Sequence, residues 1–179
     1  MIYTKSQMLS LWRNALGIDT LRSDMTLSRV DGIDIDAYIG RRMRLWYLGL
    51  LDTAPLDRLT LTDIAAGVTA VADGCCARID LPDGCRRVAS VALAGWQRAV
   101  GPVGGDEARR VMARAASPYT LPGICEPAVV ACGRSLLCMP ATTPTVASLM
   151  AVIDPGPESY VLDESLLATI PQSIDPYAL

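Results

Sequence analysis

The chain has 179 residues and a mass of 19.1 kDa, the size of one domain, and 51% of its residues are hydrophobic, enough for a sizeable core. Sixteen basic and nineteen acidic residues give a net charge of −3 and a pI of about 4.9, which argues against a free-standing DNA or RNA binder that neutralises phosphates. The longest near-continuous apolar run, residues 45–51, is far shorter than the roughly 20 residues that a membrane-spanning helix needs.

The first predicted element is a short helix over residues 4–16. Thr4 and Gln7 have the spacing of a capping box, in which each side chain bonds the other residue's backbone N–H. Apolar residues follow at helical spacing, and Gly17 is a typical stop. Residues 1–6 lack the pattern of a secretory signal, so we expect the chain to remain in the cytoplasm where it is made.

A second, longer helix is predicted from a cap at Asp34 or Asp36 to the residues before Pro55. It carries three arginines next to two aromatic residues: Arg41, Arg42, Arg44, Trp46 and Tyr47. The arginines fit a solvated face backed by core aromatics, which we favour, or a dedicated phosphate site.

The middle of the chain is predicted to be β-rich, with turns at 73–74, 82–84 and 133–134. The β-prone segments are 59–71, 77–81, 87–93, 128–132, 135–139 and 145–153. Gly95-Trp96 is expected to bend the chain into a hairpin or meander that ends at Gly101-Pro102. Residues 106–115 predict an inserted helix, because Glu107 comes early and Arg114 late, as the helix dipole favours.

The C-terminal part is predicted to hold a short helix, capped by Asp163 and running from Glu164 to about Ile170, followed by an extended tail over 171–179. This order of elements indicates an α+β fold rather than a wound parallel sheet. We expect a single domain with a helical part (1–55), an antiparallel β-rich part (56–157) and a C-terminal helix and arm (158–179).

Charge is unevenly distributed along the chain. All sixteen basic residues lie within 1–134, whereas 135–179 contain five acidic residues and no basic one. The C-terminal stretch is then either a loosely held acidic terminus that keeps the protein soluble, or an arm that docks into a neighbouring subunit through the apolar residues Ile170, Ile174, Tyr177 and Leu179.

Several enzyme classes are excluded by what the sequence lacks. It contains no histidine, which removes Ser-His-Asp and Cys-His catalysis and histidine-based zinc sites. It also lacks the glycine-rich phosphate loops, the nucleophile elbow and any cysteine pair at zinc-ribbon spacing. We predict that the six cysteines are buried small hydrophobic residues, and that no cofactor or metal is bound. Acidic pairs such as Asp34 and Asp36 fit helix caps or solvated faces better than a glycosidase pair.

Four motifs carry a family resemblance, in the same order along the chain. The first runs from Tyr3-Thr4 to Ala15-Leu16-Gly17-Ile18, and the second combines ARIDLPDG at 77–84 with RRVASV at 86–91 and Gly95-Trp96. The third is Pro118-Tyr119 with Leu136, Cys138 and Pro140, and the fourth is YVLDESLL at 160–167. Together they resemble the connector, or adaptor, proteins at the head-to-tail junction of tailed bacteriophages, including tubular tail adaptors. Several adaptors have a longer C-terminal helical bundle, which leaves the role of the final arm open.

The resemblance implies a structural virion protein without catalytic activity, which forms a homo-oligomeric ring, a dodecamer in this family, in the neck of the virion. Its partners would be the portal and the neck or tail proteins, and DNA would pass through the lumen without specific binding. It also implies that terminal segments fold on meeting the portal. An acidic or neutral lumen suits this role because it does not grip phosphates.

Three alternatives remain at this stage. The chain could be a tail-completion or stopper protein, an enzyme that uses Asp, Glu or an activated Cys85, or a small monomeric binding module. Trp12, Trp46 and Trp96 are core candidates, and Trp96 is the one expected to be partly exposed at an interface. The candidate interface residues are Arg41, Arg42, Arg44, Trp96, Ile174, Tyr177 and Leu179.

Overall fold

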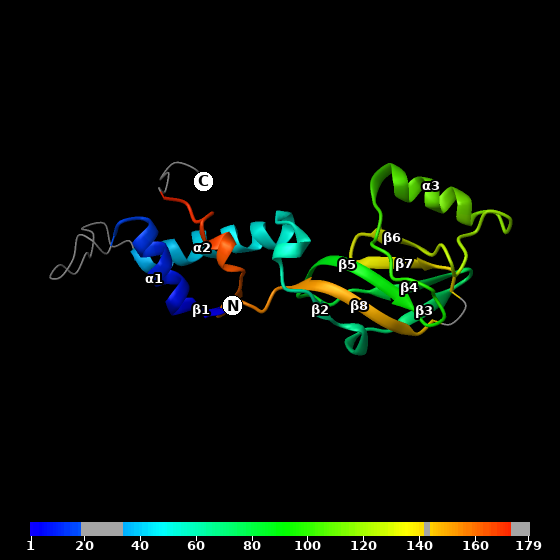
Figure 1. Ribbon diagram of the computed structural model, residues 1–179, viewed down its shortest axis with the longest axis horizontal. Helices are drawn as coiled ribbons and strands as arrows, with labels where there is room; N and C mark the ends of the chain where they lie inside the picture. Colours follow the sequence, from blue (N-terminus) through cyan, green and yellow to red (C-terminus); the bar gives the residue numbers. More distant parts are fainter. Residues whose placement is uncertain (19–33, 142–143, 173–179) are drawn as a thin grey trace. The chain divides into compact units, whose positions relative to one another are not determined.

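The computed structural model describes residues 1–18, 34–141 and 144–172, and it has the predicted α+β fold (Figure 1). The chain forms two compact units. The helical unit combines Met1–Thr60 with the C-terminal segment from Asp154, and the β-rich unit is Leu61–Ile153. The C-terminal segment, which the sequence analysis set apart as its own part, therefore packs with the N-terminal helices.

Both long helices of the helical unit begin at the predicted caps. Helix α1 (Lys5–Ala15) starts with the capping box: the Gln7 N–H donates to the Thr4 hydroxyl (3.3 Å), and the Thr4 N–H donates to the Gln7 side chain (2.8 Å). Gly17, at a φ of +69°, follows its end, as expected of a glycine stop. Helix α2 (Ile35–Thr53) is capped by Asp34, whose carboxylate accepts N–H bonds from Asp36 and Ala37.

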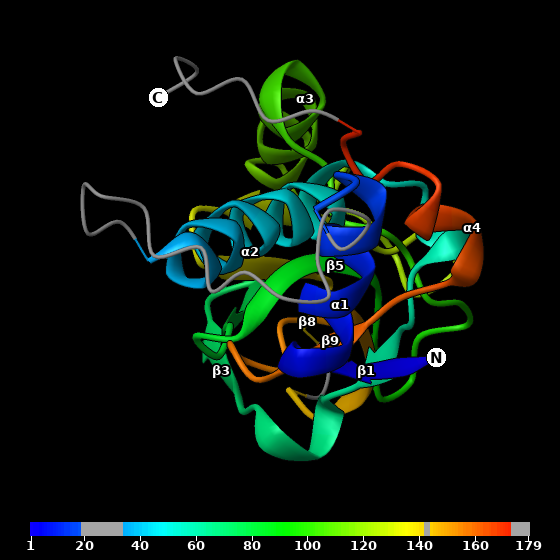
Figure 2. The same ribbon diagram turned by 90° about the vertical axis from the view of Figure 1, so that its left-hand side faces the viewer.

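A two-stranded antiparallel sheet in this unit was not predicted. Strand β1 (Ile2–Thr4) pairs with β9 (Ser159–Val161), with Tyr3 opposite Tyr160. The pairing continues at Met1, whose ammonium donates to the Leu162 carbonyl (2.7 Å) and whose carbonyl accepts the Leu162 N–H (3.0 Å). The two strands tie both ends of the described chain together, and Figure 2 shows them side by side near the start of α1.

The C-terminal helix α4 (Glu164–Leu167) is capped by Asp163 as predicted, but it is shorter than the expected 164–170. The N–H groups of Thr169 and Ile170 bond carbonyls three residues back, so the α-helical pattern gives way to tighter turns before Pro171. A short 3₁₀ helix, η2 (Leu56–Arg58), follows Pro55. The core of the unit lies between these elements, and its largest fully buried side chains are Met8, Trp12, Ile39, Met43, Tyr47, Tyr160 and Leu162.

The β-rich unit is built from two antiparallel sheets (Figure 1). The first has the order β2-β8-β5 and contains β2 (Thr62–Asp63), β5 (Cys85–Leu93) and β8 (Val146–Ile153). The second has the order β3-β4-β7-β6 and contains β3 (Ala70–Asp73), β4 (Cys76–Asp80), β6 (Ala128–Cys132) and β7 (Ser135–Met139). Buried side chains from both sheets, among them Ile79, Val91, Leu136 and Leu149, form one core.

Helix α3 (Gly105–Ala115) confirms the predicted insertion and covers a second, smaller core. Ala108, Val111 and Ala115 on its inner side pack against buried Val130 and Met139 of the second sheet. The connection from β5 to α3 contains two isolated bridges rather than a further strand: Val100 pairs with Val91 of β5, and Val103 pairs with Val130 of β6. The hairpin or meander expected after Trp96 is thus reduced to one antiparallel bridge between Val91 and Val100.

The β-prone segment 59–71 is the least accurate prediction in the unit. It contains the two-residue β2, a 3₁₀ turn η3 (Ala65–Gly67) and β3. The Asp63 carboxylate accepts N–H bonds from Ala65 and from Leu149 of β8, both at 3.0 Å. The Asp63 side chain thus accepts a bond from β8 that a backbone carbonyl would accept in a longer strand, and β2 ends at Asp63. Among the described helices, none has the length and apolar character needed to span a membrane.

Candidate functional site

The three arginines of α2 were predicted to act as one group, but in the structure each side chain lies in a different environment. Arg41 is exposed. Arg42 is half-buried, and its guanidinium donates to the Tyr38 hydroxyl at 3.3–3.4 Å and lies over the Tyr38 ring. Arg44 points toward the C-terminal segment. The favoured interpretation, a solvated face, does not hold for Arg44, whose side chain is mostly buried. The alternative of a phosphate site shared by the three arginines does not hold for Arg44 either, because its guanidinium is paired with Asp154.

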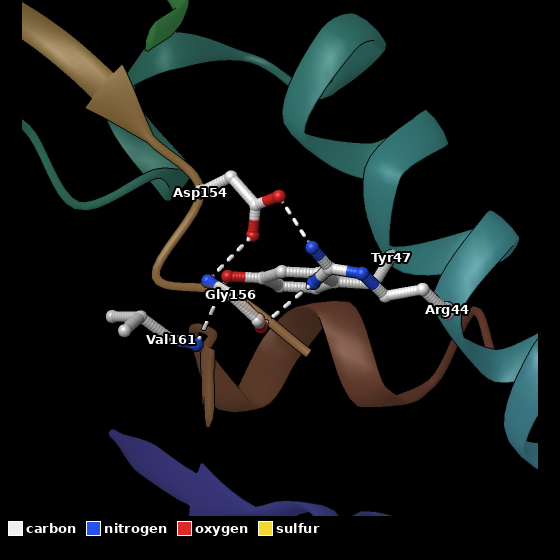
Figure 3. A network of polar contacts seen from close by, with 5 residues as sticks. All are labelled: Arg44, Tyr47, Asp154, Gly156 and Val161. Atoms are coloured by element: carbon white, nitrogen blue, oxygen red, sulfur yellow. Dashed lines mark hydrogen bonds and ion pairs between the residues drawn. The ribbon is translucent and has the colours of Figure 1, made fainter. Parts of the chain in front are cut away.

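Arg44 is the centre of a polar network that holds the C-terminal segment against α2 (Figure 3). One guanidinium nitrogen forms an ion pair with Asp154, and the other donates to the Gly156 carbonyl at 2.9 Å. The second carboxylate oxygen of Asp154 accepts the Gly156 N–H at 3.0 Å. The Arg44 and Asp154 side chains are 21% and 17% exposed, so water screens this pair much less than a surface ion pair.

Two buried tyrosines complete the network. The rings of Tyr47 and Tyr160 meet edge to face with centroids 4.9 Å apart, and the Arg44 guanidinium lies within 6.0 Å of both ring centres. The Val161 N–H donates to the Tyr47 hydroxyl at 3.1 Å (Figure 3). Burial raises the pKa of both tyrosines, against the opposing effect of Arg44. Both therefore stay protonated at neutral pH, and the Tyr47 hydroxyl and the contact between the two rings hold Tyr160 and Val161 against α2.

The acidic C-terminal stretch is firmly bound as far as the described residues extend. Asp154 pairs with Arg44, and Glu158 pairs with Lys5 at 3.0 Å. The Asp163 carboxylate caps α4 by accepting the Ser165 N–H, and hydrogen bonds from the Ser165 side chain and backbone lower its pKa. The prediction of a loosely held terminus is thus wrong for residues 154–172, because Asp154 and Glu158 pair with basic residues of the N-terminal helices and Asp163 caps α4. Ile174, Tyr177 and Leu179 lie outside the described residues.

The tryptophans occupy three different environments. Trp12 is 2% exposed, and its ring meets that of Trp46 edge to face at 5.7 Å. Trp46 is half-buried and donates from its indole N–H to the Thr169 carbonyl (3.2 Å), which also anchors the C-terminal segment. Trp96, in the β-rich unit, is half-buried against the core, and its indole N–H donates to the Pro140 carbonyl at 3.0 Å. The polar edge of Trp96 is therefore engaged within its own unit.

The prediction that all six cysteines are buried is wrong for half of them. Cys76 and Cys138 are buried, and Cys85 is half-buried, whereas Cys75, Cys125 and Cys132 are exposed because they lie in turns, in loops or at a strand end. Burial raises the pKa of Cys76 to about 11 and that of Cys138 to about 12. Burial also raises the pKa of Cys85, which is the opposite of what an activated nucleophile needs.

Residues that sequence reasoning missed are Tyr47 and Asp154 as partners of Arg44. The available signal was the separation of charge along the chain, since a cation-rich helix and a cation-free acidic segment are complementary. Within the described part of the chain, no group of three or more His, Cys, Asp or Glu residues is arranged to hold a metal ion.

We compared the chain with models of protein families and with curated proteins. No family model matches it, and no curated protein does either.

Proposed function

We propose that this chain is a structural subunit of a tailed-bacteriophage virion, assembling as a ring at the head-to-tail junction and linking the portal to the tail. The proposal rests on the four ordered motifs and on the exposed face of α2. It involves no catalytic step and no cofactor; the activity is assembly with further copies of the chain and with the portal and neck or tail proteins.

The observation that carries the proposal is the exposure of Leu45. The buried stripe of α2 contains Ile39, Met43 and Tyr47, and Leu45 lies on the other side of the helix, 66% exposed, with exposed Arg41 one turn away. Full burial of an exposed leucine side chain in an interface stabilises the complex by about 1.5–3 kcal/mol. In a ring the same contact occurs at every interface between subunits, so its stabilising free energy is added once for each subunit.

Other large apolar side chains are also exposed among the described residues. They are Met1, Ile2, Val71, Met112, Tyr119 and Ile124, with 40–96% of each accessible. They occur on both units, so each unit has apolar side chains available for contacts with a partner. The net charge of −3 suits a ring through which DNA passes without specific binding.

The test is assembly with a candidate portal ring, measured by sedimentation and negative-stain imaging of the mixture. We expect the chain to sediment with the portal as an added ring, and Leu45→Glu to lower the bound fraction at least tenfold. Ser10→Glu, which adds the same charge at an exposed position of α1, is the matched control and should bind as the unaltered chain does.

Each other outcome favours a different function. Binding to tail tubes but not to portal rings would replace the connector by a tail-completion or stopper protein. A chain that stays monomeric in the presence of portal rings and of tail tubes would contradict a virion role. That result would favour a binding module or a histidine-free enzyme.

A further inference from the structure

Two adjacent cysteines meet at the hairpin between β3 and β4. Asp73 pairs with Cys76, so Gly74 and Cys75 form the two-residue turn, with Gly74 at a φ of +62°. The two sulfur atoms are 3.7 Å apart, in van der Waals contact. Cys75 is exposed, and Cys76 is buried at 8% exposure. An accessible thiol therefore touches a buried one.

We propose that Cys75 and Cys76 are an oxidation site, at which a small-molecule disulfide converts the two thiols into a vicinal disulfide. The thiolate of Cys75 attacks one sulfur of the small disulfide, forms a mixed disulfide and releases one small thiolate. The thiolate of Cys76 then attacks the Cys75 sulfur and releases the second. Two electrons pass from the protein to the small disulfide, which leaves as two thiols after taking up the two protons.

The geometry makes the product reversible. The Cα atoms of adjacent residues are about 3.8 Å apart across a trans peptide, whereas disulfides usually join Cα atoms about 4.4–6.8 Å apart. A bond between neighbours is therefore strained, and strained, exposed disulfides are the ones that thiols reduce readily. Cys125 and Cys132 are exposed too, but neither has a thiol neighbour in the described part of the chain. Their reaction with the small-molecule disulfide therefore stops at the mixed disulfide.

Closing the bond affects α3, because the Cys76 side chain belongs to the small core beneath that helix. It forms one buried cluster with Val130 and Met139, and the inner residues of α3 pack against this cluster. Forming the bond brings the sulfur atoms from 3.7 Å to about 2.05 Å and draws the Cys76 sulfur toward the exposed turn. Interiors are close-packed, so the loss of this sulfur leaves α3 less tightly held.

The attack by Cys76 is expected to limit the rate. In the reduced pair, burial raises the pKa of Cys76 to about 11, and Cys75 and Asp73 add to the effect. The contribution of Cys75 is lost once Cys75 is in the mixed disulfide, whereas burial and Asp73 still favour the thiol of Cys76. Cys138 of β7 is the other titratable group near it, and the α3 residues that face it are apolar. At pH 7–9 the Cys76 thiolate is a minor species that increases about tenfold per pH unit. The closing rate should rise accordingly, and Asp73→Asn should raise it at fixed pH.

The experiment incubates the full chain with oxidised glutathione at pH 8 and maps the peptides by mass. We expect the peptide with Cys75 and Cys76 to lose about 2 Da and to recover with dithiothreitol, while Cys132 gains a glutathione adduct. Hydrogen exchange in α3 should increase in the oxidised protein and not in oxidised Cys75→Ser, where the bond cannot form. Cys132→Ser, the matched control, cannot form the adduct at position 132 and should leave the loss of about 2 Da and the faster exchange in α3 unchanged.

A stable glutathione adduct on Cys75, or two unreacted thiols beside a modified Cys132, would overturn the proposal. A vicinal disulfide without a change in α3 exchange would overturn the link to the helix. The result is independent of whether the chain assembles with a portal.

Discussion

Replacing Arg44 by methionine should release the C-terminal segment from α2. The substitution keeps an unbranched side chain of similar length but removes the ion pair with Asp154 and the bond to the Gly156 carbonyl. Breaking a fully buried pair costs about 3–5 kcal/mol and breaking an exposed pair less than about 1 kcal/mol. With side chains 21% and 17% exposed, this pair falls between them, and we expect a loss of about 2–3 kcal/mol.

The loss should be local, so it is best read from hydrogen exchange of the segment 154–162. The Val161 amide is a direct reporter because it bonds the Tyr47 hydroxyl. A loss of 2–3 kcal/mol corresponds to exchange about 30- to 150-fold faster. Arg41→Met is the matched control: Arg41 is exposed on the same helix, and its replacement should change stability by less than about 0.5 kcal/mol.

Two further variants separate the ion pair from general damage to the helix. Arg44→Lys keeps the charge but not the two-pronged geometry, and should lie between the native chain and Arg44→Met. Arg44→Met with Asp154→Asn should lose less than the sum of the two single changes, because the unpaired carboxylate is gone. Exchange that is less than threefold faster in Arg44→Met, or strict additivity in the double variant, would refute the role of Arg44 in holding the C-terminal segment against α2.

Three other predictions concern single contacts. Tyr47→Phe keeps the ring contact but leaves the buried Val161 N–H without its acceptor, and should lower the free energy of unfolding by about 1–3 kcal/mol in urea titrations. Thr4→Ala removes the capping box and should cost about 1 kcal/mol, seen as faster exchange in the first turn of α1, whereas Ser10→Ala should not. The backbone hydrogen bonds to the Asp63 carboxylate lower its pKa below the unfolded value, so its contribution is present above about pH 4 and is lost as pH falls through the folded pKa. When the pH is lowered below about 4, the urea concentration at which the β-rich unit is half unfolded should decrease. The decrease should be less steep in Asp63→Asn.

Local chemistry in the sequence predicted the boundaries of many elements. A Thr or Asp side chain that bonds a backbone N–H two or three residues further on is typical of a helix start, which is why the caps at Thr4, Asp34 and Asp163 could be predicted. The hairpin at Gly133-Arg134 was predicted to the residue for a different local reason: a two-residue turn requires a left-handed backbone, and Gly133 adopts a φ of +62° that few other residues accept.

Contacts between distant segments could not be predicted in this way. Strands β1 and β9 have three residues each, too few to display a period of two, and their pairing depends on the return of the C-terminal segment to the start of the chain. Arg44 was grouped with its neighbours in sequence, although successive helical residues point in directions about 100° apart. Its partner, Asp154, is 110 residues away.

The most direct test of the proposed function is the mass of the purified chain by light scattering, alone and then with a candidate portal ring. We expect either a ring of the chain alone or a 19.1 kDa monomer that adds to the portal in a fixed number of copies. A monomer whose mass is unchanged by the portal would contradict it.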